Sequence, residues 1–255
     1  MKMNYRHFLK LLVLWPLLFC LGVAKAEINP RTTIILLTEN YPPFNMSVND
    51  KNFAREDNID GLSTDIVREM FKRAGVKYRL SLRFPWSRIY KLTQQKRNYG
   101  LFSTTRTEAR EDLFKWVGPL VVNEWVFLTL NNKPIRLRNL NEARKYRIGG
   151  YKGDAIANHL ENNGFNLVLS FRDNENVAKL VDGRIDLWAT GNLSGRYLAQ
   201  LEGVENLKNV LTFKSTEMYL AFNKETSDEV IDVLQNALDE MVRDGTHQTL
   251  TNDYL

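Results

Sequence analysis

The pattern of apolar and polar residues predicts a chain in which strands alternate with helices. Residues 32–38 form an almost wholly apolar run rich in β-branched side chains, which is typical of a strand buried on both faces of a parallel sheet. Apolar residues then recur at helical spacing from Leu62 to Ala74, and Gly75 is a favourable helix stop. Further strands are expected at 76–83, 99–103, 123–130, 147–151, 164–169, 184–190 and 218–222. Further helices are expected to end near residues 95, 162, 182 and 200. A last helix is expected over 227–244, with Ser227 as its N-terminal cap.

These strands and helices fall into two blocks, at about 30–120 and 145–215, and the last helix follows the second block. We therefore predict an α/β protein of two lobes, each a mostly parallel sheet flanked by helices. Open sheets of this kind bind ligands at the carboxyl ends of their strands, so the ligand cleft is expected between the lobes. The expected first lobe is 27–122 plus 223–255, and the second is 123–222 with the two crossover segments.

The first 26 residues have the features of a signal peptide. Basic residues precede an apolar run over 11–23, and residues 24–26 (Ala-Lys-Ala) match the small-x-small cleavage pattern. The run is shorter than the roughly 20 apolar residues of a spanning helix, so we predict cleavage that leaves Glu27 first, with an uncleaved anchor as the alternative. The chain's one cysteine, Cys20, lies in this run and lacks the small preceding residue of a lipoprotein signal.

The charge of the exported chain argues against a polyanionic partner. Removing residues 1–26 takes away four positive charges and no negative ones, which lowers the net charge from +5 to +1. Little basic excess is left to neutralise nucleic acid or an anionic membrane. The exported chain also has no cysteine, so it folds without disulfides in an oxidising compartment. We expect a monomer that binds no nucleic acid.

A stretch of hydroxyl and guanidinium side chains follows the expected strand at 99–103. The stretch contains Thr105 and Arg106, and Arg110 follows four residues after Arg106. Short hydroxyls and backbone N–H groups can hold a carboxylate, which a guanidinium binds through two parallel hydrogen bonds. The stretch is therefore a candidate anion site, and the alternative is a solvated turn with surface ion pairs.

Two aromatic residues stand at the ends of expected strands. Tyr41 follows the first strand and precedes two prolines, which keep the loop extended, and Trp86 follows the strand at 76–83. Both are candidates for a ligand-cleft wall, although a tryptophan near a proline also commonly fills a helix–sheet seam. The three histidines are not on loops of the expected cleft, and no metal-ligand spacing or phosphate-binding loop occurs. We expect neither a metal nor a cofactor.

Four short motifs, in their order and spacing, resemble those of a known family. They are Tyr-Pro-Pro-Phe at 41–44, Gly-Leu-Ser-Thr-Asp-Ile-Val at 61–67, the 107–110 segment that leads to Gly118-Pro119-Leu120, and Gly-Arg-Ile-Asp at 183–186. In these the chain is similar to the polar amino-acid-binding branch of the periplasmic solute-binding proteins, family 3. The resemblance implies the type II two-lobed fold, a periplasmic location, and a non-catalytic protein that delivers its ligand to an ABC permease or a membrane sensor.

The resemblance also implies roles for individual residues. Arg110 resembles the arginine that holds the ligand's α-carboxylate, and Thr105 takes a hydrogen-bonding position. Tyr41 and Trp86 resemble the aromatic walls of the site. Arg106 stands where the family usually has an apolar residue, so it binds a second acidic group or faces solvent.

One position departs from the family pattern. Members that bind α-amino acids place an aspartate at the position of Gly191, where it accepts the ligand's ammonium. Asp154, at the start of the helix expected over 155–162, is then the candidate acceptor, and the alternative is that it only caps this helix. We expect a protein that captures an amino acid or similar small carboxylate, with a cyclohexadienyl dehydratase-like enzyme on the same fold as the alternative.

Overall fold

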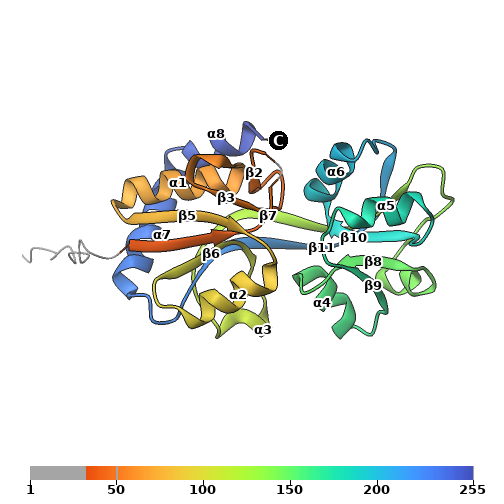
Figure 1. Ribbon diagram of the computed structural model, residues 1–255, viewed down its shortest axis with the longest axis horizontal. Helices are drawn as coiled ribbons and strands as arrows, with labels where there is room; N and C mark the ends of the chain where they lie inside the picture. Colours follow the sequence, from red (N-terminus) through yellow and green to blue (C-terminus); the bar gives the residue numbers. More distant parts are fainter. Residues whose placement is uncertain (1–32, 50, 255) are drawn as a thin grey trace, which may run out of the picture.

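The computed structural model describes residues 33–49 and 51–254, and the expected signal peptide at 1–26 lies outside them. Two α/β lobes stand side by side, and one nine-stranded sheet runs through both (Figure 1). Its strand order is β3-β5-β1-β6-β11-β7-β10-β8-β9. The predicted two-lobed α/β architecture is confirmed.

The first lobe is built around β1, which pairs in parallel with β5 and β6. Helix α1 packs its apolar side chains into the core of this lobe and ends where Gly75 adopts a left-handed conformation (φ 66°), as the sequence predicts. The elements of this lobe are β1 (Thr33–Thr38), β2 (Met46–Ser47), β3 (Phe53–Arg55), η1 (Glu56–Asn58), β4 (Ile59–Asp60), α1 (Leu62–Ala74), β5 (Lys77–Arg83), α2 (Trp86–Gln95), β6 (Tyr99–Thr105), α3 (Glu108–Glu111), α7 (Asp228–Arg243) and α8 (Thr246–Asn252).

The second lobe repeats the arrangement on a smaller scale. Strand β8 lies between β10 and β9 and pairs with both in parallel, and helices lie on both sides of these strands (Figure 1). Its elements are η2 (Leu140–Lys145), β8 (Ile148–Tyr151), α4 (Ala155–Asn162), β9 (Leu167–Ser170), α5 (Glu175–Val181), β10 (Leu187–Gly191) and α6 (Asn192–Leu201).

Two long antiparallel strands, β7 (Lys115–Leu130) and β11 (Leu207–Phe222), connect the lobes (Figure 1). Residues near the start of β7, such as Val121, belong to the first core, whereas Trp125 and Phe127 belong to the second. The sequence predicts only the parts at 123–130 and 218–222, because Gly118 and Pro119 interrupt the apolar pattern of β7 and the polar residues from Lys214 to Glu217 interrupt that of β11.

The C-terminal segment returns to the first lobe. Helix α7 packs against α1, and the Ser227 side chain accepts a hydrogen bond from the Val230 backbone N–H, so the predicted cap is confirmed. Gly245 then turns the chain with a φ of 83° into α8, a short helix that the sequence analysis does not predict. This segment completes the first lobe around β1 and α1.

Candidate functional site

Five of the six residues predicted for the site line one small cavity between the lobes. The cavity has a volume of about 30 Å³. Because both lobes contribute to it, any group bound there contacts both. The predicted residues that line it are Tyr41, Trp86, Thr105 and Arg110 from the first lobe and Asp154 from the second.

Arg110 is the buried cation of this cavity. It lies in α3, its exposure is only 8%, and its guanidinium lies over the rings of Trp86 (5.9 Å) and Tyr90 (5.2 Å). Within the described part of the chain, the one hydrogen bond that its side chain donates goes to the Thr105 carbonyl (3.2 Å). A guanidinium has five N–H donors, so most of this fork is available to an anion in the cavity.

The structure places Arg106 outside the cavity. Its side chain is 39% exposed, forms an ion pair with Glu111, and lies over the rings of Trp116 and Tyr219. The ion pair raises the pKa of Arg106. This position agrees with the solvent-facing alternative for Arg106 and not with a role at the cavity.

Asp154 both lines the cavity and caps a helix. One carboxylate oxygen accepts a hydrogen bond from the Ile156 backbone N–H (3.0 Å), which satisfies a free donor in the first turn of α4. Burial raises the pKa of Asp154, while the helix N–H groups and the positive charge of Arg110 act in the opposite direction. The capping role is thus realised, and the carboxylate also faces the ligand cleft.

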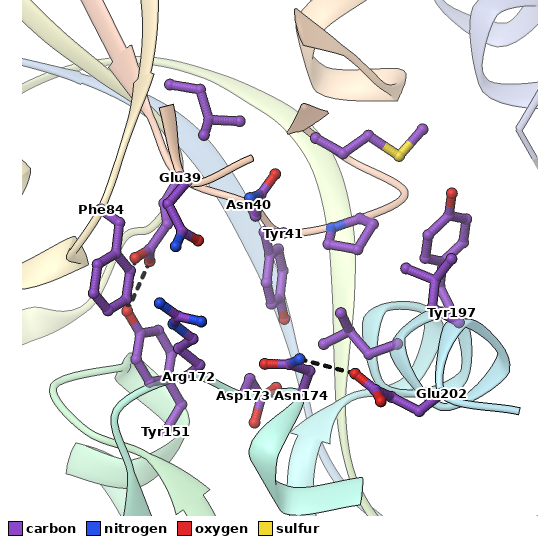
Figure 2. Close-up of a pocket in the computed structure, with 16 residues that line it drawn as sticks. Glu39, Asn40, Tyr41, Phe84, Tyr151, Arg172, Asp173, Asn174, Tyr197 and Glu202 are labelled. Carbon is purple, nitrogen blue, oxygen red and sulfur yellow. Dashed lines mark hydrogen bonds between the residues drawn. The ribbon is translucent and has the colours of Figure 1, made fainter. Parts of the chain in front are cut away.

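Glu39 and Tyr151 are site residues that the sequence analysis misses. Glu39 follows β1 and is 8% exposed, and its carboxylate accepts hydrogen bonds from the Tyr151 hydroxyl (2.9 and 2.8 Å) and the Trp86 backbone N–H (2.9 Å). Figure 2 shows this contact, which joins the two lobes. Burial is the main cause that raises the pKa of Glu39 to about 8. The strand-end rule that selects Tyr41 applies equally to Glu39.

A larger cavity has a volume of about 310 Å³. Figure 2 shows the residues that line it. Glu39, Tyr41 and Tyr151 line both cavities, so the two are parts of one cleft. On the far side Asp173 accepts hydrogen bonds from the Trp188 indole N–H (2.8 Å) and a threonine hydroxyl, and burial raises its pKa to about 6. The cleft therefore has one buried guanidinium at its narrow end and several carboxyl groups along its length.

The absence of a side chain at Gly191 has a steric reason. A Cβ at this position would lie 2.3 Å from the Tyr41 hydroxyl and 2.7 Å from the Asn123 side-chain oxygen. Asn123 itself donates a hydrogen bond to the Tyr41 hydroxyl (3.0 Å). These two side chains occupy the space that an acidic side chain at position 191 would need.

The residues that the structure describes contain no group of three or more His, Cys, Asp or Glu side chains placed to hold a metal ion. Across the same residues, no helix combines the length and the apolar character needed to cross a bilayer.

Comparisons with known proteins identify the family. The model of the bacterial extracellular solute-binding proteins, family 3, matches residues 34–255. The chain is similar to a probable histidine-binding protein of Campylobacter jejuni, with 25% identity over 245 residues that cover 91% of this chain and 88% of the relative. Among solved structures, a histidine kinase sensor domain superposes with a TM-score of 0.78 (17% identity, 88% of this chain, 96% of the other). An arginine-, lysine-, histidine-binding protein from Geobacillus stearothermophilus superposes with a TM-score of 0.74 (17% identity, 88% of this chain, 95% of the other). The chain belongs to the bacterial extracellular solute-binding proteins, family 3.

Proposed function

We propose that this protein captures an amino acid or a similar small carboxylate in the cleft between its lobes. The observation that carries the proposal is the buried Arg110 guanidinium, which faces the cavity with most of its donors unused by the described residues. A planar guanidinium in a partly desolvated site binds a carboxylate strongly and in one orientation. The family membership supports the same class of ligand.

The ligand's carboxylate binds at Arg110 and Thr105, and the rest of the ligand extends toward Tyr151 and the larger cavity. The cavity beside Arg110 has a volume of only about 30 Å³, so an amino acid enters only when the lobes or their side chains move apart. Because β7 and β11 are the strands shared by both lobes, bending in these strands provides that movement. The lobe boundaries at 122/123 and 222/223 are part of this proposal.

The captured ligand is then delivered to a membrane protein. Relatives and structural neighbours include both a binding protein and a sensor domain, so an ABC importer and a signalling receptor are the two classes of partner. We propose that the chain acts in the periplasm, as a monomer, after removal of residues 1–26.

A thermal-shift panel tests this function. The exported protein is measured with the twenty L-amino acids, with the desamino carboxylic acid of each, and with neutral sugars as controls. A ligand at 100 times its Kd adds about 2.7 kcal/mol to the free energy of unfolding, so a true ligand gives a clear rise in Tm. Absence of a shift with every carboxylate contradicts the proposal. Conversion of a bound compound, followed by NMR, would place the protein among the enzymes instead.

A further inference from the structure

Glu39 occupies a special place in the cleft. It lines both cavities, it comes from the first lobe, and it shares the small cavity with Arg110. An α-amino acid carries its amine on the carbon next to its carboxylate, so an amine follows the carboxylate into the same narrow space. We infer that Glu39 accepts the ligand's amine there, in place of an acidic side chain at position 191, where this chain has glycine. This inference rests on the proposed function.

Position 191, in the second lobe, does not supply the acceptor for the ligand's amine. The Tyr41 hydroxyl and the Asn123 amide fill the space around Gly191 and are hydrogen-bonded to each other. An ammonium in a closed cleft needs an anionic partner, because an unpaired buried charge costs several kcal/mol. The acceptor must therefore be another carboxylate that lines the small cavity, and the candidates among the described residues are Glu39 and Asp154.

The hydrogen bonds of the two candidates favour Glu39. The Asp154 carboxylate already accepts a hydrogen bond from the Ile156 N–H in the first turn of α4, and it interacts with the positive charge of Arg110. The donors to Glu39 are the Tyr151 hydroxyl and the Trp86 backbone N–H, both neutral. A cationic amine would give the Glu39 carboxylate a charge-assisted hydrogen bond, which is about twice as strong as a neutral one.

The release of a proton from Glu39 on ligand binding offers an independent test of this inference. The groups around Glu39 are the Tyr151 hydroxyl of β8, Asp154 at the start of α4, Asp173 after β9 and the Trp86 N–H of α2. Two guanidinium groups also line its cavities, Arg110 the small one and Arg172 the larger one. Because burial raises the pKa of Glu39 to about 8, its carboxyl is mostly protonated well below that pH, and the proton measurement is made at pH 6. An ammonium placed against it favours the carboxylate, so binding of an amino acid releases about one proton.

The test compares each L-amino acid of the panel with its own desamino carboxylic acid. Affinities are measured for the wild type, for Glu39→Gln and for Asp154→Asn, which removes the other carboxylate of the small cavity while keeping much of the cap. Glu39→Gln is expected to lower the preference for the amine-bearing partner by about 30-fold or more, as for a broken buried charge pair. The preference should be kept in Asp154→Asn. Calorimetry of the wild type in buffers of different ionisation enthalpy should show about one proton released with the amino acid and none with the desamino acid.

Five results would overturn the inference. If Glu39→Gln keeps the preference, or Asp154→Asn alone loses it, the amine binds elsewhere and the proposed function stands. If the wild type binds the desamino acids equally well, or releases no proton, the site recognises a carboxylate without an amine at Glu39. If the wild type binds no member of any pair, the proposed function itself falls and takes the inference with it. The proton measurement uses the wild type only, so it decides the matter even where a variant folds poorly.

Discussion

Replacing Arg110 with alanine is the most direct test of how the cleft binds an anion. The guanidinium is buried, it packs over the rings of Trp86 and Tyr90, and it faces the small cavity. Without it, a carboxylate in this cavity would lose its bidentate cationic partner. It would instead be desolvated without a cationic partner, in a cavity that Asp154 and Glu39 also line.

The expected loss of affinity is large. Removing one partner of a buried, hydrogen-bonded charge pair costs about 2 to 5 kcal/mol, which corresponds to a Kd higher by roughly 30-fold to several thousand-fold. Isothermal titration calorimetry with the strongest carboxylate of the panel measures this change. The matched control is Arg106→Ala, since Arg106 lies four positions earlier, pairs with Glu111 and does not line the cavity. Its Kd is expected to change by less than about threefold, in line with the small energies of exposed ion pairs.

The opposite order of effects would refute this reasoning. If Arg106→Ala weakened binding more than Arg110→Ala, the anion site would lie at the exposed cluster of Arg106, Trp116 and Tyr219. A change of Tm in Arg110→Ala must also be measured, because the side chain contributes packing over two aromatic rings. A loss of binding that only follows unfolding would leave the carboxylate role unsupported.

Three further predictions concern stability. Ser227→Ala removes the cap of α7 and should lower the free energy of unfolding by about 1 kcal/mol in urea titrations; no change would mean that the cap is not needed. The pKa of Glu39 is raised from 4.5 to about 8, so between these pH values the folded state keeps a proton that the unfolded state loses. The free energy of unfolding should therefore fall as the pH rises from 4.5 to 8, and this fall should be smaller in Glu39→Gln. Gly191→Ala should lower Tm because its Cβ meets the Tyr41 hydroxyl, and restoration of Tm by the added Tyr41→Phe change would locate the clash.

Much of the fold could be predicted because its signals are local. The apolar run of β1, the helical spacing of α1 with Gly75 at its end, and the Ser227 cap each depend on neighbouring residues in the chain. The two long crossover strands could be predicted only in part. In β11 the residues from Lys214 to Glu217 are polar and mostly exposed, and pairing with β7 rather than apolar periodicity keeps them extended.

Part of the candidate site, too, could be predicted from the sequence and part could not. The strand-end positions of Tyr41, Trp86 and Arg110 follow from the sequence, and the structure brings them to one cavity. The roles of Glu39 and Tyr151 depend on how the two lobes face each other, since their hydrogen bond joins residues 112 positions apart in the chain. A pattern of apolar and polar residues holds no information on such a pairing.

The hydrogen bond between Tyr151 and Glu39 also sets a requirement on the ligand. Opening the cleft separates the two groups, and a ligand that enters between them must replace what each loses. A neutral donor would give Glu39 a bond of about the same strength, whereas bonds to charged groups are worth about 1.5–3 kcal/mol against roughly 0.5–1.5 for neutral ones. Above the Glu39 pKa of about 8, where the carboxyl is ionised, a cationic amine therefore gains free energy from the exchange that a hydroxyl or an amide does not. Below that pH, the loss of the Glu39 proton offsets part of this gain. The preference for a ligand with a cationic amine would then have two causes. The amine is attracted to the Glu39 carboxylate, and it is a stronger donor than the Tyr151 hydroxyl that it replaces.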